Sequence, residues 1–246
     1  MSEQQRLDEQ AIALAAEMGL SSKLDAAEKI DVDVKTDIFK AVQGQADTVK
    51  IFGQGLVMQK DIHVQEMELH MDNIDIDPLS VLLGQIELKH PVDAIAKFVV
   101  TEQDINRALN SDYVQNQMPA FDLNVEGQIV SLKMQQMELL LPDNDKMIFS
   151  GKALLQESSN SRQLDFSAVI HPRTSKQPVL VEGFHCKDGQ TISLEFAVAL
   201  LGKMKEITQL PYFELGKMAI RIKEMEVQTG KITLYTEARV REIPQT

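Results

Sequence analysis

The side chains of this 246-residue chain that could bind a metal share no ligand spacing. A structural zinc site needs four converging ligands, yet the chain has one cysteine, Cys186, and five scattered histidines: His63, His70, His90, His171 and His185. His185 and Cys186 are adjacent, so in an extended strand they would point to opposite faces. We therefore expect neither a metal site nor a cofactor.

Three pairs of carboxylates resemble calcium or glycosidase sites at first sight: Asp31 and Asp33, Asp75 and Asp77, and Asp143 and Asp145. The first two pairs alternate with Ile or Val, which is typical of the solvated face of a strand, and the third pair lies in a turn. The chain also has no nucleophile elbow, Walker loop, dinucleotide fingerprint or HExxH helix. We expect a protein that is not an enzyme.

The charge of the chain excludes some partners. Lys+Arg 25 against Asp+Glu 37 gives a net charge of -12, which repels phosphate backbones, so nucleic acid is not an expected partner.

A single cysteine allows no intramolecular disulfide. The first residues, MSEQQRLDEQ, lack the basic start and apolar core of a secretory signal. No apolar run reaches the ~18 residues of a membrane span. We expect a cytoplasmic location, with peripheral membrane contact left open.

A six-residue pattern occurs three times, at Val64–Leu69, Met134–Leu139 and Ile222–Val227. In each copy apolar residues alternate with polar ones as in a strand, but the alternation is interrupted by two consecutive polar residues. The apolar residues therefore change parity, from even-numbered positions before the polar pair to odd-numbered positions after it. Apolar residues stay on one face after such a change only if an extra residue is absorbed, usually in a β-bulge. The pattern predicts three bulged strands, and their similarity suggests one bent sheet.

The remaining elements predict an α+β, β-dominated fold with a long, bent, mostly antiparallel sheet, a few covering helices and an apolar groove. Apolar residues from Leu7 to Met18 recur at helical spacing, so residues 1–29 form an N-terminal amphipathic helical segment. This helix either packs on the sheet or contacts a membrane. No linker divides residues 30–246, so we expect one domain there. Thr101 and Asp104 form a variant capping box at a helix start.

The apolar face of the bulged strands is the candidate binding surface. Each strand spans about ten residues, well above the usual five or six, and the predicted helices are few and short. Part of the face could therefore remain open to an apolar ligand, with flexible methionines as lining; alternatively, helices or a second layer close the core completely. The candidate lining residues are Ile62, Val64, Met67, Leu69, Met71, Met134, Met137, Leu139, Met218, Ile222 and Met225.

Three stretches, in the order in which they follow one another along the chain, are similar to those of a known family: Val49–Leu56, Ile74–Asp77 and Val100–Leu109. They resemble the LmeA-type phospholipid-binding family, most closely its cyanobacterial members. The strongest match is the helix start Thr-Glu-x-Asp-Ile-Asn-x-Ala-Leu, which begins at Thr101. The resemblance implies a β-rich lipid-binding domain without catalytic residues that acts at or near the cell envelope. Without a recognisable signal segment, the cytoplasmic side of a membrane is the simpler expectation.

These observations favour non-catalytic binding of a phospholipid or another acyl-chain lipid in an apolar groove, in lipid transfer or in membrane or envelope maintenance. Two alternatives stay open. A scaffold or assembly protein would dock a protein partner on the same apolar face. An enzyme acting on a lipid-like substrate would cluster Asp and His inside the groove.

Overall fold

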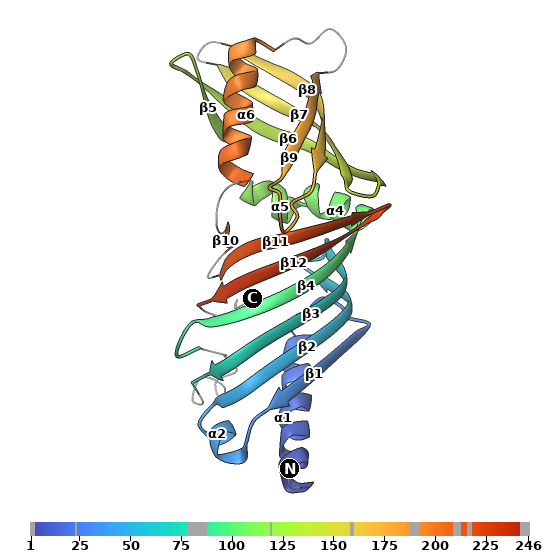
Figure 1. The fold of residues 1–246 in the computed structure, drawn as a ribbon, viewed down its shortest axis with the longest axis vertical. Helices are drawn as coiled ribbons and strands as arrows, with labels where there is room; N and C mark the ends of the chain where they lie inside the picture. Colours follow the sequence, from blue (N-terminus) through green and yellow to red (C-terminus); the bar gives the residue numbers. More distant parts are fainter. Residues whose placement is uncertain are drawn as a thin grey trace. The chain divides into compact units, whose positions relative to one another are not determined.

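The strands of this chain pair into two sheets in the part of the chain that the structure describes (Figure 1). The computed structural model describes residues 3–22, 24–77, 88–118, 120–157, 160–186, 192–208, 213–215 and 218–241. A strongly curved seven-stranded sheet has the order β1-β2-β3-β4-β12-β11-β10, and a five-stranded sheet has the order β5-β6-β7-β8-β9. All strand pairs of defined register are antiparallel. The predicted β-dominated fold is confirmed, but the expectation of a single sheet is wrong.

The elements of the seven-stranded sheet and the helices beside it come from both ends of the chain: α1 (Glu3–Ser21), β1 (Lys29–Lys35), α2 (Ile38–Val42), β2 (Gln45–Met58), β3 (Ile62–Asp75), β4 (Val92–Thr101), β10 (Phe213–Leu215), β11 (Met218–Gln228) and β12 (Lys231–Val240). The middle of the chain supplies the rest: α4 (Glu102–Leu109), α5 (Asp112–Gln117), β5 (Phe121–Val125), β6 (Gln128–Asp143), β7 (Lys146–Glu157), β8 (Asn160–His171), β9 (Leu180–Cys186) and α6 (Leu194–Thr208).

The contacts between residues divide the chain into two units. The first unit comprises Met1–Val100, Pro211–Lys223 and Thr233–Thr246, and the second comprises Thr101–Leu210 and Glu224–Ile232. Strands β11 and β12 each contribute residues to both units. The expectation of one domain over residues 30–246 stays a prediction, because it concerns whether the two units unfold together.

The core of the first unit lies between helix α1 and the first three strands. Val32 and Val34 of β1 and Ile51 of β2 are buried, as strand alternation requires of the inward face. Helix α1 packs on this face with apolar residues at helical spacing, among them Ile12 and Ala16. Of the two roles considered for the N-terminal helix, packing on the sheet is the one that the structure shows.

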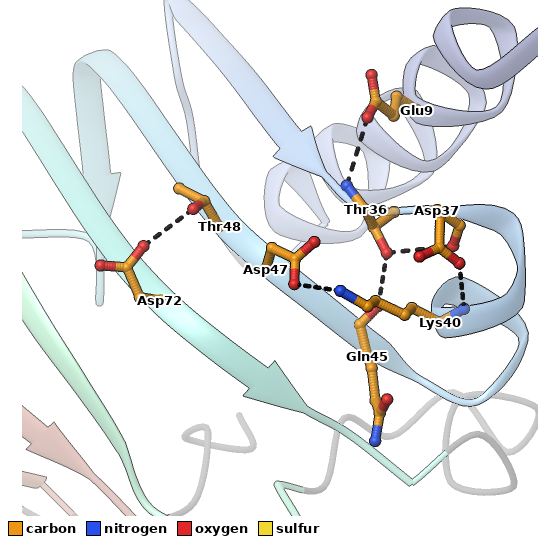
Figure 2. A network of polar contacts seen from close by, with 8 residues as sticks. All are labelled: Glu9, Thr36, Asp37, Lys40, Gln45, Asp47, Thr48 and Asp72. Carbon is orange, nitrogen blue, oxygen red and sulfur yellow. Dashed lines mark hydrogen bonds and ion pairs between the residues drawn. The ribbon is translucent and has the colours of Figure 1, made fainter. Parts of the chain in front are cut away.

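Helix α1 also satisfies backbone groups at the edge of the sheet. Strand β1 is the edge strand, so its outward N–H groups have no neighbouring strand. The N–H of Val32 donates to the Glu17 carboxylate at 3.0 Å. The N–H of Thr36 donates to the Glu9 carboxylate at 3.4 Å (Figure 2). Two glutamates on one face of the helix therefore take the place of a strand.

The short helix α2 is held by polar contacts (Figure 2) that leave two of its apolar side chains exposed. The Asp37 carboxylate accepts the Lys40 N–H at 2.9 Å as an N-cap. The Lys40 ammonium lies 2.7 Å from Asp47 on strand β2. Phe39 and Val42 are nevertheless 79% and 72% exposed.

The second unit is built on a five-stranded meander that helix α6 covers on one face. Leu123, Leu132, Leu155 and Leu164 from four successive strands are almost fully buried, and Phe196 of α6 is buried against them. The 12-residue strands β7 and β8 pair along their whole length from Met147 onward. Among the described residues, no helix has both the length and the apolar character needed to cross a membrane.

Helix α4 lies along the edge of strand β6, beyond the point where β5 stops pairing with it. Strand β5 pairs only with residues 128–132 of β6. Further along, Asn110 both accepts from and donates to the backbone of Met137, and Asn106 does the same for Leu139. The helix begins at the predicted N-cap, where the Thr101 hydroxyl accepts the Asp104 N–H at 3.1 Å.

Each of the three repeated segments lies within a strand, as predicted, but the first and third belong to the seven-stranded sheet and the second to the five-stranded sheet. The second copy has the predicted bulge, because the pairing of β6 with β7 shifts register between Met134 and Gln136. The carbonyl of Gln136 then lies directly over Gly151 of β7, where an added Cβ would collide with this oxygen. Only glycine fits opposite this bulge.

The first copy changes parity without a register shift. Val64 is buried, Gln65 and Glu66 are exposed, and Met67 is inward again, although the pairing of β2 with β3 keeps one register on both sides. The reason is that β2 changes parity at the same level, where Gly55 has a φ of +59°. Both strands absorb one residue, so the pair stays aligned. No register is defined for the third copy, whose bulge stays a prediction.

Candidate functional site

An apolar cavity of about 360 Å³ lies within the second unit. Its wall presents no polar surface among the described residues. The volume falls at the lower end of the range typical of small-molecule sites. The lining residues come from the inner face of the five-stranded sheet and from helices α4 and α6: Leu109, Met118, Phe121, Leu123, Leu132, Met134, Met137, Phe149, Leu164, Phe166, Ala168, Phe184, Leu200, Lys203 and Met204.

Three phenylalanines on neighbouring strands form one wall of the cavity. Phe149 of β7, Phe166 of β8 and Phe184 of β9 lie in sequence across the sheet, with ring centroids 5.9 Å and then 5.4 Å apart. The second pair is stacked, with an interplanar angle of 15°. Gly151 pairs with Phe166, and the side-chain atom nearest to its missing Cβ is the methyl carbon of Met134, at 3.3 Å. The sequence reasoning missed the three phenylalanines, although each occupies an inward position of its strand.

Helix α6 forms the roof of the cavity. Leu200 and Met204 face the cavity, and Phe196 fixes the helix to the core. Lys203 lines the cavity as well, but its ammonium lies 3.0 Å from the Glu206 carboxylate one turn further along the helix. The methylene stem of Lys203 thus contributes apolar surface, whereas its charge stays with Glu206 in solvent.

The structure places two of the predicted lining residues, Met134 and Met137, in this cavity. Leu139 on the same strand is half-buried, and its backbone is bonded to Asn106. Met225 belongs to the second unit too, where its N–H donates to the carbonyl of Arg173 at 2.8 Å.

The other predicted lining residues belong to the first unit, so the structure does not gather the predicted set into one groove. Met67, Leu69 and Met71 pack on the core beneath helix α1, and Val64 is buried. The remaining members lie in strands β3 and β11, and the side chain of Met218 is outside the described part of the structure: Ile62, Ile222 and Met218. Met67, Leu69 and Met71 therefore lie in a core that a helix closes, which is the alternative to an open groove considered above.

The opposite face of the five-stranded sheet has an open polar depression of about 670 Å³. Glu138, Lys152, Asp165 and His185 line it, together with polar side chains of α4. Glu138 is exposed and accepts a hydrogen bond from Ser150, as expected of a side chain on the solvated face. Within the ranges that the structure describes, no group of three or more His, Cys, Asp or Glu side chains could hold a metal ion.

The one cysteine lies between this depression and the core. The Cys186 side chain contacts the hydrophobic cluster of the second unit and also borders the depression. Burial raises the pKa of the Cys186 thiol, and the nearby Arg162 opposes this shift. A thiol with a raised pKa is a weak nucleophile at neutral pH, so the surroundings of Cys186 suit a structural residue.

Fold and cavity together define a β-dominated protein with an apolar chamber roofed by a helix. The profile of the LmeA-like phospholipid-binding family matches residues 4–237. The match covers most of the chain, which therefore belongs to the LmeA-like phospholipid-binding family, as its sequence motifs indicated. No curated protein and no solved structure matches the chain. Lipid binding is thus the general function of its family.

Proposed function

We propose that the chain binds an acyl chain of a phospholipid, without catalysing a reaction on it, in the cavity between the five-stranded sheet and helix α6. The observation that carries the proposal is the wholly apolar wall of this cavity in a member of a phospholipid-binding family. Such a wall suits methylene groups and offers no partner to a polar head group. The head group would therefore remain outside, in solvent or in a membrane surface.

Burial of methylene groups is the driving force of the proposed binding. Each buried methylene contributes about 0.8 kcal/mol, so about ten of them would contribute about 8 kcal/mol before the costs of ordering the ligand. Met134, Met137 and Met204 have flexible, polarizable side chains that can adapt to chains of different length and unsaturation. This supports a role in lipid transfer or membrane maintenance at a membrane surface, in preference to recognition of one particular head group. The cytoplasmic location stays a prediction.

The direct test is organic extraction of the purified, folded protein followed by mass spectrometry of the extract. We expect acyl lipid in the extract of the wild type. Ala168 lines the cavity and is 1% exposed, so Ala168→Met fills cavity space that the acyl chain needs. We expect this variant to carry less lipid per mole of folded protein.

Glu138→Gln is the matched control, because Glu138 lies on the solvated face of the same sheet. This variant should carry as much lipid as the wild type. Wild-type protein that contains no lipid, and takes up none from vesicles, would contradict the proposal and favour a protein partner as the ligand of the apolar surfaces. Equal lipid content in Ala168→Met and the wild type would show that lipid binds elsewhere.

A further inference from the structure

Helix α6 is apolar on two opposite faces. Its inner face carries Phe196 and Leu200, which pack on the core of the second unit. Its outer face carries Leu194, Val198 and Leu201, which recur at helical spacing and are 75%, 61% and 48% exposed. A helix that is apolar all round normally has apolar surroundings on both sides. We call the three exposed residues the outer stripe.

The outer stripe is too small for a stable interface with a second copy of the chain. A standard protein interface involves about 20–30 residues on each side, with a well-packed apolar centre. The outer stripe offers three side chains on one helix. A lipid surface has no such requirement, because the binding of a helix to a membrane interface scales with the apolar area that it buries there.

The net charge of the chain decides which lipid surface the outer stripe fits. The charges on α6 itself balance, because Glu195 and Glu206 stand against Lys203 and Lys205, and Lys203 lies 3.0 Å from the Glu206 carboxylate. Hydrogen bonds from its own backbone N–H and from Ser193 lower the pKa of Glu195, so this residue is charged at neutral pH. With a net charge of -12 on the whole chain, an anionic bilayer would repel the protein.

We propose that the outer stripe of α6 docks on the surface of a zwitterionic bilayer and inserts Leu194, Val198 and Leu201 among the lipids. The inference rests on the proposed acyl-chain cavity, because α6 is also the roof of that cavity. One helix then contacts the membrane with its outer face and the bound acyl chain with its inner face. A lipid leaving the bilayer beside α6 has only the width of this helix to pass before its chain is again in an apolar environment.

The chain has no tryptophan, so single introduced tryptophans report on one site each. We would prepare Val198→Trp, on the outer stripe, and Ile129→Trp as a matched control on strand β6, because Ile129 is a similarly exposed aliphatic residue (56%) of the same unit. On addition of phosphatidylcholine vesicles, we expect a blue shift of tryptophan emission for Val198→Trp and none for Ile129→Trp. A shift in neither variant, or in both, would overturn the proposal.

Vesicle sedimentation gives the second readout. Val198→Gln and Leu201→Gln should each weaken association with phosphatidylcholine vesicles about tenfold, since each removes one inserted aliphatic side chain. Both positions are exposed, so the variants should fold normally. Vesicles that also contain phosphatidylglycerol should bind the wild type no better. Tighter binding to these anionic vesicles would overturn the charge argument and the proposal with it.

Two further outcomes separate the alternatives. A blue shift of Val198→Trp that grows with protein concentration in the absence of vesicles would identify the outer stripe as a contact between copies and overturn the proposal. Extraction of lipid from the same preparations tests the cavity independently. Wild type that carries lipid while Val198→Trp shows no shift would leave acyl-chain binding supported and the docking role of α6 rejected.

Discussion

At the scale of single residues, Gly151 shows how one backbone irregularity constrains the sequence of a neighbouring strand. The bulge in β6 moves the carbonyl of Gln136 over the Cα of Gly151. A Cβ in this position would collide with the carbonyl oxygen, and backbone cannot move aside as a flexible side chain can. The same glycine pairs with Phe166, a residue in the wall of the cavity.

We expect Gly151→Ala to lower the free energy of unfolding by about 1–3 kcal/mol, because the methyl group forces the bulge out of its position. Urea unfolding followed by circular dichroism measures this change. The matched control is Gly202→Ala, in the exposed part of α6, where an added Cβ meets nothing within 4 Å. This substitution should stabilise the protein by up to about 1 kcal/mol through helix propensity. Equal effects of the two substitutions would contradict the role of the bulge.

His171 makes the stability of the second unit dependent on pH. Its Nε2 lies 2.9 Å from Glu182, and its Nδ1 lies 3.1 Å from the carbonyl of Asp145. Both partners accept hydrogen bonds, so the protonated ring satisfies both. The hydrogen bond to Glu182 is the main cause that raises the pKa of His171 above its ordinary value of 6.5.

Because the pKa is raised in the folded state, the contribution of His171 to stability is fully present below about pH 6.5 and is lost as the pH rises through the folded-state pKa. We expect the difference in unfolding free energy between wild type and His171→Gln to be larger at pH 5.5 than at pH 8.5. Urea titrations of both proteins at the two pH values measure it. A difference that is independent of pH would show that the ring does not gain a proton between these limits.

At the scale of elements, helices replace strands at a sheet edge in both units. Four residues of a helix rise about 6 Å, and two residues of a strand rise about 6.6 Å, so side chains four apart on a helix can match alternate residues of a strand. Glu102, Asn106 and Asn110 of α4 are spaced in this way and bond to the backbone of Leu141, Leu139 and Met137, respectively. Glu9 and Glu17 of α1 are eight residues apart, twice this spacing, and bond to the backbone of Thr36 and Val32, which are four residues apart along the edge of the other sheet.

Asn106→Ala tests the contribution of this edge arrangement. The substitution removes two hydrogen bonds and leaves the N–H and C=O of Leu139 without a protein partner, so we expect a loss of about 2 kcal/mol in the free energy of unfolding. Gln103→Ala, an exposed position of the same helix, is the control and should change stability by no more than about 0.5 kcal/mol. If both variants unfold at the same urea concentration, the hydrogen bonds of Asn106 contribute nothing measurable.

The motif that best matches the family is explained by this helix. Thr101 and Asp104 form its N-cap, and Glu102 and Asn106 bond to the edge of β6. The motif therefore positions the sheet whose inner face lines the cavity, and it does so from outside the apolar wall. Of its residues, only Leu109 reaches the cavity.

At the scale of the whole molecule, the two units share strands β11 and β12. The boundary in β11 falls between Lys223 and Glu224, which are the skipped polar pair of the third repeat. A strand that belongs to two units cannot remain paired in one of them while the other unfolds around it. We therefore expect a single cooperative unfolding transition.

Tryptophan reporters in the two units test this expectation. Ile95→Trp lies in the first unit and Ile129→Trp in the second, and both positions are exposed enough to accept the ring. Urea transitions followed by the emission of each reporter and by far-UV circular dichroism should coincide. Two separated midpoints would show that the units are independent domains and would contradict the single domain over residues 30–246.

Local features of the fold could be predicted from the sequence, whereas its long-range pairing could not. The interruption of the apolar alternation at Gln135 and Gln136 indicates a bulge, and it could be recognised because it lies within the sequence of a single strand. Which sheet a strand joins depends on partners far away in the chain, as the hydrogen bond from Thr236 to the carbonyl of Ala96 illustrates. For the same reason the predicted methionines separate into two units, and among those whose side chains the structure describes only Met134 and Met137 of β6 reach the cavity.

The edge of β6 sealed by α4 has a consequence for how the protein can fail. Two side-chain amides and the Glu102 carboxylate hold this edge closed, so detachment of α4 exposes the unpaired backbone of residues 137–141 while the sheet remains intact. An open edge of this kind is a template for strand addition by another chain, including a second partly opened copy. Aggregation of this protein on heating should therefore start from release of one helix, and variants that loosen α4 should aggregate at temperatures where the sheets are still folded.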